Sequence, residues 1–192
     1  PLESNNLANS TDCMIASFSC TGAYRWTNLI GGAETDFSRN IKTDAQGNIY
    51  AAGKVIRASE TLPVKFESQS DNDTILPHSA LNNEHKRSLF LVKYNADGEL
   101  QWLQMPQPED ISMADAFSNT FSFYVDIDAQ GNIYWVCLIT PGIYANGAFT
   151  NTAEGKSLHI FKYDANGNFI EATPLEMEIE FTLPEFKIAR NH

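Results

Sequence analysis

Two aspartates, Asp126 and Asp128, stand two residues apart, so their side chains share one face of an extended strand. Two carboxyl groups several ångströms apart can cleave a glycosidic bond, one as the acid and the other as base or nucleophile. In the competing interpretation, Asp128 accepts hydrogen bonds from its own turn and Asp126 is a solvated surface residue. A related segment of the chain has Lys42 in place of Asp126, so the acid pair is not part of a repeat.

Metal and cofactor chemistry finds little support in the sequence. A calcium loop of the D-x-[DN]-x-[DN]-G type places glycine sixth, whereas the Asp-x-x-Gly elements here place it fourth, with the poor ligands Ala45 and Gln46 between. Neither the four histidines nor the three cysteines have the spacing of a metal site or a disulfide framework. We therefore predict turns at these aspartates, with no metal and no cofactor.

Aromatic side chains are the other candidates for ligand binding. Trp135 stands where a matching segment has Ala51, so it is free of the packing that the repeat requires, and its ring could stack on a sugar or peptide. Tyr144 and Phe149 follow in the next loop. The competing interpretation places Trp135 in the core. A polar insertion, residues 57–87, is either a recognition loop or a tolerated surface excursion.

These candidates lie within a chain of internal repeats. The heptapeptide DAQGNIY occurs at residues 44–50 and again at 128–134. A second repeat occurs three times, at residues 12–26, 88–102 and 157–171, aligned by one glycine in each copy. Repetition of this kind indicates a fold made of similar units.

Each copy has the pattern of a β-hairpin. SLFLVKY and SLHIFKY are continuous apolar runs of strand length, typical of strands covered on both faces. An Asp, Asn or Ser follows, whose side chain accepts backbone hydrogen bonds, and a glycine three residues later supplies a positive φ. The five predicted turns are Ser19–Gly22, Asp44–Gly47, Asn95–Gly98, Asp128–Gly131 and Asp164–Gly167.

The order of the two repeat types predicts an all-β fold of four-stranded antiparallel blades, as in a β-propeller. Strands flank DAQGNIY, the Ser-Leu hairpin ends each blade, and a further strand is expected in the long segment between them. The predicted divisions of the chain are an extension (1–11) and a single domain (12–192), comprising a lone outer hairpin (12–29), a first blade (30–107), a second blade (108–175) and one strand of a further blade (176–192).

Over about 160 of the 192 residues the chain resembles the repeat of bacterial secreted β-propellers, the SBBP-type repeats. The likeness rests on D-x-x-G-N-I-Y followed by L-F-L-V-K-Y-N-x-x-G-x-x-x-W. It departs at Glu171, where the other copies have Trp26 and Trp102. The resemblance implies a ring of four-stranded blades on an exported, periplasmic, cell-surface or extracellular protein, with no single catalytic activity.

Two blades with flanking strands are too few for a ring. The sequence therefore leaves three alternatives open: a fragment of a longer protein, self-association that completes the ring, or a different closure. We favour the fragment. The chain begins with Pro1, which fits removal of an export signal or trimming.

The composition limits the kinds of partner that this chain can bind. A net charge of −11 repels nucleic acid and anionic lipid, and the longest apolar run, residues 133–139, is far shorter than the roughly 20 residues of a membrane-spanning helix. Three functions remain: an exported non-catalytic scaffold that binds a protein or glycan, a propeller-class glycoside hydrolase or lyase that uses Asp126, and a sensor domain of a larger surface receptor. The first is the preferred expectation, and an enzyme is the less favoured one.

Overall fold

The computed structural model describes residues 11–32, 35–56, 63–70, 73–76, 87–106 and 120–176, and within these ranges it contains strands, turns and loops but no helix. The prediction of an all-β fold with four-stranded antiparallel sheets is confirmed. Among these residues there is thus no helix of the length and apolarity needed to cross a membrane. Most of the predicted extension (1–11) and nearly all of the segment 176–192 lie outside the described residues.

Three sheets of four strands account for most of the described chain. Sheet I has the order β1 (Cys13–Phe18), β2 (Tyr24–Gly31), β5 (Val64–Phe66) and β6 (Thr74–Leu76). Sheet II has the order β3 (Phe37–Thr43), β4 (Ile49–Ile56), β7 (Arg87–Tyr94) and β8 (Leu100–Gln104). Sheet III has the order β9 (Phe121–Ile127), β10 (Ile133–Ile139), β13 (Ser157–Tyr163) and β14 (Phe169–Leu175). A two-stranded ribbon, β11 (Gly142–Tyr144) and β12 (Phe149–Asn151), lies between β10 and β13 in the chain.

The prediction that each sheet contains an extra strand between DAQGNIY and the Ser-Leu hairpin is wrong. The hairpin itself supplies the third and fourth strands, because β4 pairs directly with β7 and β10 with β13. The segment between β4 and β7 instead contributes β5, which pairs with the edge of β2, and β6, which pairs with β5. The hairpin of residues 12–29 is therefore not alone, because it forms half of a four-stranded sheet.

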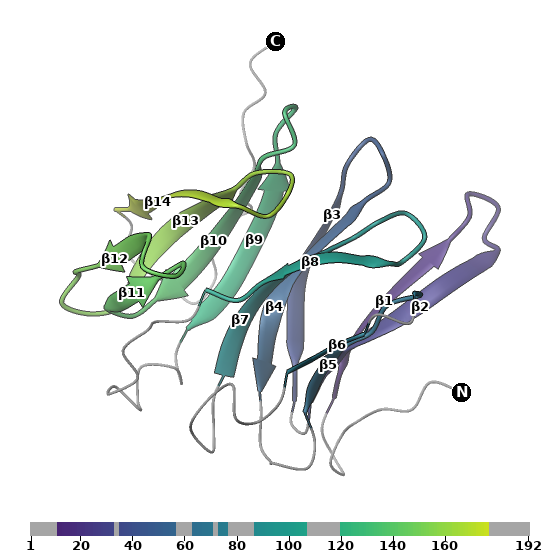
Figure 1. Cartoon of the computed structure of the whole chain (residues 1–192), viewed down its shortest axis with the longest axis horizontal. Coiled ribbons are helices and arrows are strands. Elements are labelled where there is room, and N and C mark those ends of the chain that lie inside the picture. Colours follow the sequence, from purple (N-terminus) through teal and green to yellow (C-terminus); the bar gives the residue numbers. More distant parts are fainter. Residues whose placement is uncertain are drawn as a thin grey trace.

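The sheets lie face to face in chain order, I then II then III, and do not close on themselves (Figure 1). One core cluster joins sheets I and II, and another joins sheets II and III. All five predicted turns lie at the same end of the sheets (Figure 1). An open stack of this kind fits an incomplete ring.

The strand β7 explains why the middle sheet is buried on both faces. Side chains alternate along a strand, so Leu89 and Leu91 join the cluster shared with sheet III, while Phe90 and Tyr94 join the cluster shared with sheet I. Burial of each such side chain contributes about 1.5–3 kcal/mol. A continuous apolar run is therefore required, as the sequence predicts.

Candidate functional site

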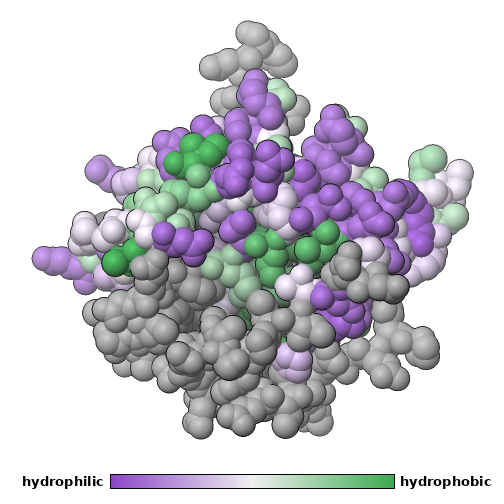
Figure 2. Space-filling view, in the orientation of Figure 1, coloured by the Kyte–Doolittle hydropathy of each residue, from purple (hydrophilic) through white to green (hydrophobic). Residues whose placement is uncertain are grey.

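A groove of about 680 Å³ lies between the two DAQGNIY turns, one from sheet II and the other from sheet III. Hydrophilic residues cover the part of the molecule where the turns lie, and hydrophobic residues gather at the middle of the same face (Figure 2). The titratable side chains that line the groove are Lys42, Asp44, Tyr50, Lys93, Asp126 and Asp128.

Asp44 organises the first turn. Its Oδ1 accepts the backbone N–H groups of Gln46 and Asn48 at 3.0 and 2.9 Å, and its Oδ2 accepts the Asn48 amide at 2.7 Å and the Tyr50 hydroxyl at 3.1 Å. Gly47 completes the reversal with φ of 81° and donates its N–H to the Asp44 carbonyl. Partial burial acts to raise the pKa of Asp44, but these hydrogen bonds outweigh it and hold that pKa below its usual value.

The second turn repeats this arrangement. Asp128 accepts the backbone N–H groups of Gln130 and Asn132 at 2.9 Å each, the Asn132 amide at 2.8 Å and the Tyr134 hydroxyl at 3.2 Å. Burial again opposes ionisation, and the hydrogen bonds again lower the pKa of Asp128. The carboxylate is held as a turn anchor, as the competing sequence interpretation predicts. Within the described residues, no group of three or more His, Cys, Asp or Glu side chains is placed to hold a metal ion.

Asp126 faces the equivalent position of the neighbouring sheet. Lys42, which replaces Asp126 in the first repeat, places its Nζ 3.8 Å from Asp126 Oδ1. Both side chains are partly shielded, with 33% and 15% of their surfaces exposed. The exchange of residue between two matching repeats thus creates opposite charges that meet across the groove. Asp126 and Asp128 therefore have different partners, one in an ion pair and the other in a turn.

Lys93 also lines the groove. Its Nζ donates to the Ala165 carbonyl of sheet III at 3.0 Å and lies 5.2 Å from the centre of the Tyr50 ring. Lys162, its counterpart in sheet III, lies at the same distance from Tyr134. Lys93 thus links sheet II to sheet III and supplies positive charge beside the Asp44 turn.

The three aromatic candidates lie within the core. Trp135 is fully buried, and its indole N–H donates to the Ser122 hydroxyl at 2.9 Å. Tyr144 is also buried and donates its hydroxyl proton to the Thr140 carbonyl at 2.9 Å. Phe149 is partly buried beside them. In this structure their rings pack against other side chains, which is the competing interpretation of Trp135.

The tryptophans of the hairpin repeat make the contact that recurs between sheets. Trp26 of sheet I donates its indole N–H to the Ala96 carbonyl in the turn of sheet II at 3.0 Å. A Cβ on Gly98 of that turn would lie 2.7 Å from the indole ring. Only glycine therefore allows the turn to rest on the indole at this distance.

The same contact joins the next two sheets. Trp102 donates to the Ala165 carbonyl at 3.2 Å, and a Cβ on Gly167 would lie 2.8 Å from its ring. The sequence shows both the tryptophans and the glycines, but their pairing runs from one copy of the repeat to the next. The exchange of Trp for Glu171 in the third copy is the signal that could have suggested a contact with a following sheet.

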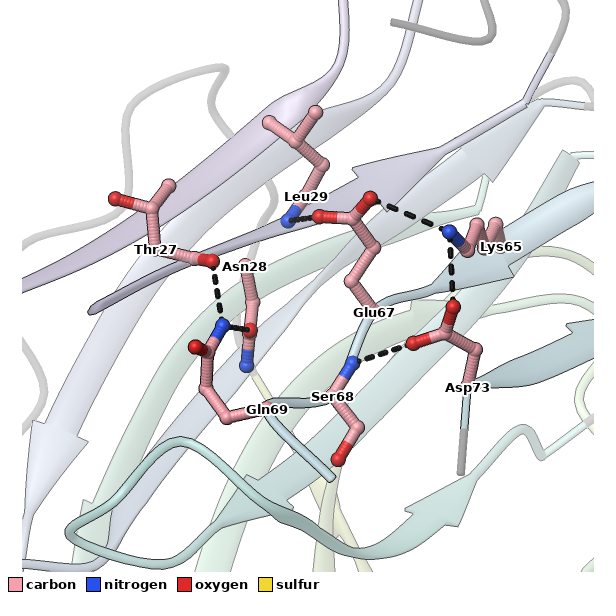
Figure 3. Close-up of polar contacts among 8 residues, drawn as sticks. All are labelled: Thr27, Asn28, Leu29, Lys65, Glu67, Ser68, Gln69 and Asp73. Atoms are coloured by element: carbon pink, nitrogen blue, oxygen red, sulfur yellow. Dashed lines mark hydrogen bonds and ion pairs between the residues drawn. The ribbon is translucent and has the colours of Figure 1, made fainter. Parts of the chain in front are cut away.

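The described part of the insertion 57–87 binds sheet I and the turn of sheet II. Glu67 accepts the Leu29 N–H at 2.8 Å, and Lys65 bridges Glu67 and Asp73 at 3.3 and 2.8 Å (Figure 3). Gln69 donates its side-chain amide to the Thr27 carbonyl and to the Asn28 side chain at 2.8 and 2.7 Å (Figure 3). Between the two sheets, the backbone N–H of Gln69 and the side-chain amide of Asn28 both donate to the Gly98 carbonyl, at 3.1 and 2.7 Å. This part of the insertion therefore holds two sheets together.

No known protein-family model matches the chain, and no curated protein is significantly similar to it in sequence. Its function is therefore inferred from the groove and from the repeated contacts between sheets.

Proposed function

We propose that this chain is an exported, non-catalytic segment of a β-propeller of the SBBP-repeat type, acting as a rigid scaffold that binds a protein or glycan in the groove between its paired turns. One observation carries the proposal: the same Trp, Ala carbonyl and Gly contact joins sheet I to sheet II and sheet II to sheet III. A radial or stacked array requires each unit to contact the next unit in the same way.

Rigidity of the groove follows from these contacts. Asp44 and Asp128 each accept four hydrogen bonds within their own turns, so the walls of the groove are held by the turns themselves. A preformed site loses less conformational entropy when a ligand binds. Turns that are held in place by a rigid sheet are therefore suited to binding a ligand.

The lining suits a hydroxyl-rich or peptide ligand. Both walls of the groove carry carboxylate and amide groups, the wall from sheet II adds the ammonium groups of Lys42 and Lys93, and the exposed Gln46 and Gln130 stand at matching positions in the two turns. Such a mixture of donors and acceptors binds sugar hydroxyls or a peptide backbone through hydrogen bonds. The overall charge of −11 makes a polyanionic ligand the less favourable choice.

A binding experiment tests the proposal with a matched pair of variants. The chain is screened against a panel of neutral oligosaccharides and extended peptides, and the best binder is titrated against Lys93→Gln and Lys162→Gln. Lys93 lines the groove, whereas its counterpart Lys162 is not among the lining residues. We expect Lys93→Gln to weaken binding about tenfold, the value of one charge-assisted hydrogen bond, and Lys162→Gln to leave it within twofold. Equal effects of the two variants, or no binding across the panel, would contradict the proposal.

The hydrolase alternative is tested on the same panel. Because Asp128 is held by its turn and Asp126 faces Lys42, we expect no release of reducing ends or unsaturated products from any glycan. Turnover by the wild-type chain that is lost in Asp126→Asn, with an unchanged circular dichroism spectrum, would overturn the scaffold in favour of a propeller-class hydrolase or lyase.

A further inference from the structure

The outer face of sheet I carries exposed apolar side chains. Met14, Phe18 and Tyr24, from β1 and β2, expose 64%, 58% and 64% of their surfaces, and the rings of Phe18 and Tyr24 touch edge to face. Three large apolar residues exposed together on one hairpin mark a place where another molecular surface binds.

The repeat shows what covers this face elsewhere in the molecule. Aligned by their glycines, Met14, Phe18 and Tyr24 of sheet I correspond to Phe90, Tyr94 and Leu100 of sheet II. Phe90 and Tyr94 are fully buried and Leu100 is partly buried, all in the cluster shared with sheet I. In sheet II, the equivalent face is therefore covered by the preceding sheet.

The turn of sheet I is built to receive the same contact. Its two backbone hydrogen bonds and the bond from the Ala23 N–H to Ser19 Oγ match bonds of the receiving turns, and Gly22 has φ of 83°, as Gly98 and Gly167 have. Each of those two glycines faces an indole ring, whereas a Cβ on Gly22 would meet no atom within 4 Å. Cys20 occupies the place of Ala96 and Ala165, whose carbonyls accept the indole N–H.

The opposite end of the described stack does not offer that indole. Glu171 stands at the tryptophan position of sheet III and forms an ion pair with Lys162 at 3.5 Å. In sheet II, the corresponding Lys93 and Trp102 both donate to the Ala165 carbonyl. A second copy of this chain, docking through sheet III, would present a carboxylate to a carbonyl oxygen, which is repulsive.

We propose that the outer face of sheet I binds a further sheet of the same repeat whose hairpin carries tryptophan at the position of Trp26 and Trp102. The incoming indole N–H donates to the Cys20 carbonyl, its ring lies against Gly22, and its apolar face covers Met14, Phe18 and Tyr24. The contact is the continuation of the two interfaces already present. It is separate from the groove, so it holds or fails independently of ligand binding there.

The variant Glu171→Trp converts sheet III into such a partner. It restores the indole and releases Lys162 from its ion pair, so that both donors of sheet II are reproduced. In sedimentation velocity, we expect the wild-type chain to stay monomeric and Glu171→Trp to form head-to-tail oligomers whose size grows with concentration. Glu171→Phe, which keeps the ring but lacks the N–H, should associate about tenfold more weakly.

Two further measurements locate the contact. Adding Phe18→Asp to Glu171→Trp changes a side chain that is exposed in the single chain and should reduce association at least tenfold. Cys20 is exposed whereas Cys13 and Cys137 are buried, so alkylation of Cys20 reports on the face directly and should slow when Glu171→Trp associates. If Glu171→Trp fails to fold, as judged by circular dichroism, Glu171→Phe provides the same test at higher concentration.

Three results would overturn the proposal: a wild-type chain that oligomerises as strongly as Glu171→Trp, aromatic variants that fold and remain monomeric, or association that Phe18→Asp does not weaken. Failure of these tests would leave the groove and its ligands unaffected, because no groove residue is changed.

Discussion

The two interfaces between sheets share one contact and differ in everything around it. Both have an indole N–H on a turn carbonyl and a glycine against the indole ring. At the interface between sheets I and II, Asn28 of β2 and Gln69 of the insertion donate neutral hydrogen bonds to the Gly98 carbonyl, and Arg25 forms an exposed ion pair with Asp97 at 3.4 Å. At the interface between sheets II and III, lysines supply the additional links: Lys93 to Ala165, Lys54 to Thr120 and Lys42 to Asp126.

The comparison distinguishes the contact that both interfaces share from the contacts that are particular to one interface. Tryptophan and glycine recur because the indole of one sheet packs against the glycine in the turn of the next sheet. Neutral hydrogen bonds and lysines replace one another because either can surround that contact. The following experiments test this division, starting with the contact itself.

Removal of an indole should have the largest effect. Trp26→Ala deletes a side chain that is only 4% exposed, together with its hydrogen bond to Ala96, and we expect it to lower the free energy of unfolding by about 3–5 kcal/mol. Trp102 is only partly buried, so Trp102→Ala should cost less. Urea denaturation followed by circular dichroism measures both.

Glu171→Ala is the matched control at the third copy of the position. Its ion pair with Lys162 is partly exposed to water, so its removal should change the free energy of unfolding by less than about 1 kcal/mol. If the three substitutions had equal effects, the indole contacts would not be what joins the sheets.

Substitution of the turn glycines by alanine allows the stability of two variants to be compared at the same backbone geometry. Gly98 and Gly22 both have φ of 83°, so a change to alanine imposes the same backbone strain of about 1–2 kcal/mol on each. Only at Gly98 would the new Cβ also meet an indole ring and Gln69, each at 2.7 Å. We therefore expect Gly98→Ala to be less stable than Gly22→Ala by about 1–3 kcal/mol in urea unfolding. Equal losses would mean that the turn can move away from Trp26 without cost.

Local features of the fold could be predicted from the sequence because they depend on neighbouring residues. The Asp44 and Asp128 turns, the strands around them and the burial of SLFLVKY all follow from apolar runs and from Asp-x-x-Gly spacing. The strand order does not follow from the sequence, because β5 pairs with β2 of a different sheet and β6 pairs with β5. Three-residue strands carry too little pattern to indicate a partner, and tertiary contacts decide their position.

The candidate site illustrates the same limit. Asp126 could be identified as a candidate, but its facing lysine could not, since Lys42 and Asp126 are 84 residues apart and meet only when the sheets stack. Trp135 looked available because it differs between repeats. In sheet III its ring instead packs against Phe161, and its indole N–H donates to the Ser122 hydroxyl.

The turn aspartates predict a loss of stability in acid. Because the pKa of Asp44 and of Asp128 is lower in the folded chain than in the unfolded one, their stabilising contribution is complete above the usual carboxyl pKa of about 4 and is lost as the pH falls through the lowered value. Asp44→Asn should cost about 1–2 kcal/mol at neutral pH and flatten this acid dependence, because the new amide cannot accept from Tyr50.

The turn at Asn95 suggests a second substitution that should restore part of the stability lost in Asp44→Asn. Asn95 occupies the same turn position with an amide, and there the partner is reversed, with Asn95 donating to Glu99 at 2.7 Å. Asp44→Asn combined with Asn48→Glu recreates that pair and should recover part of the lost stability. Chemical denaturation across pH 3–7 measures both variants. An acid dependence that is unchanged in Asp44→Asn would show that this carboxylate does not contribute.

The smallest effect is expected from the ion pair across the groove. Lys42 and Asp126 are 3.8 Å apart and partly exposed to water, where such pairs contribute about 0–1 kcal/mol. A double-mutant cycle with Lys42→Gln and Asp126→Asn isolates their coupling, which should stay below about 1 kcal/mol and decrease as salt is added. A larger, salt-insensitive coupling would mean that charge, rather than the tryptophan contact, fixes sheet III against sheet II. The lysines would then be part of what the repeat requires, and an interface without lysine links, such as that between sheets I and II, would be the exception.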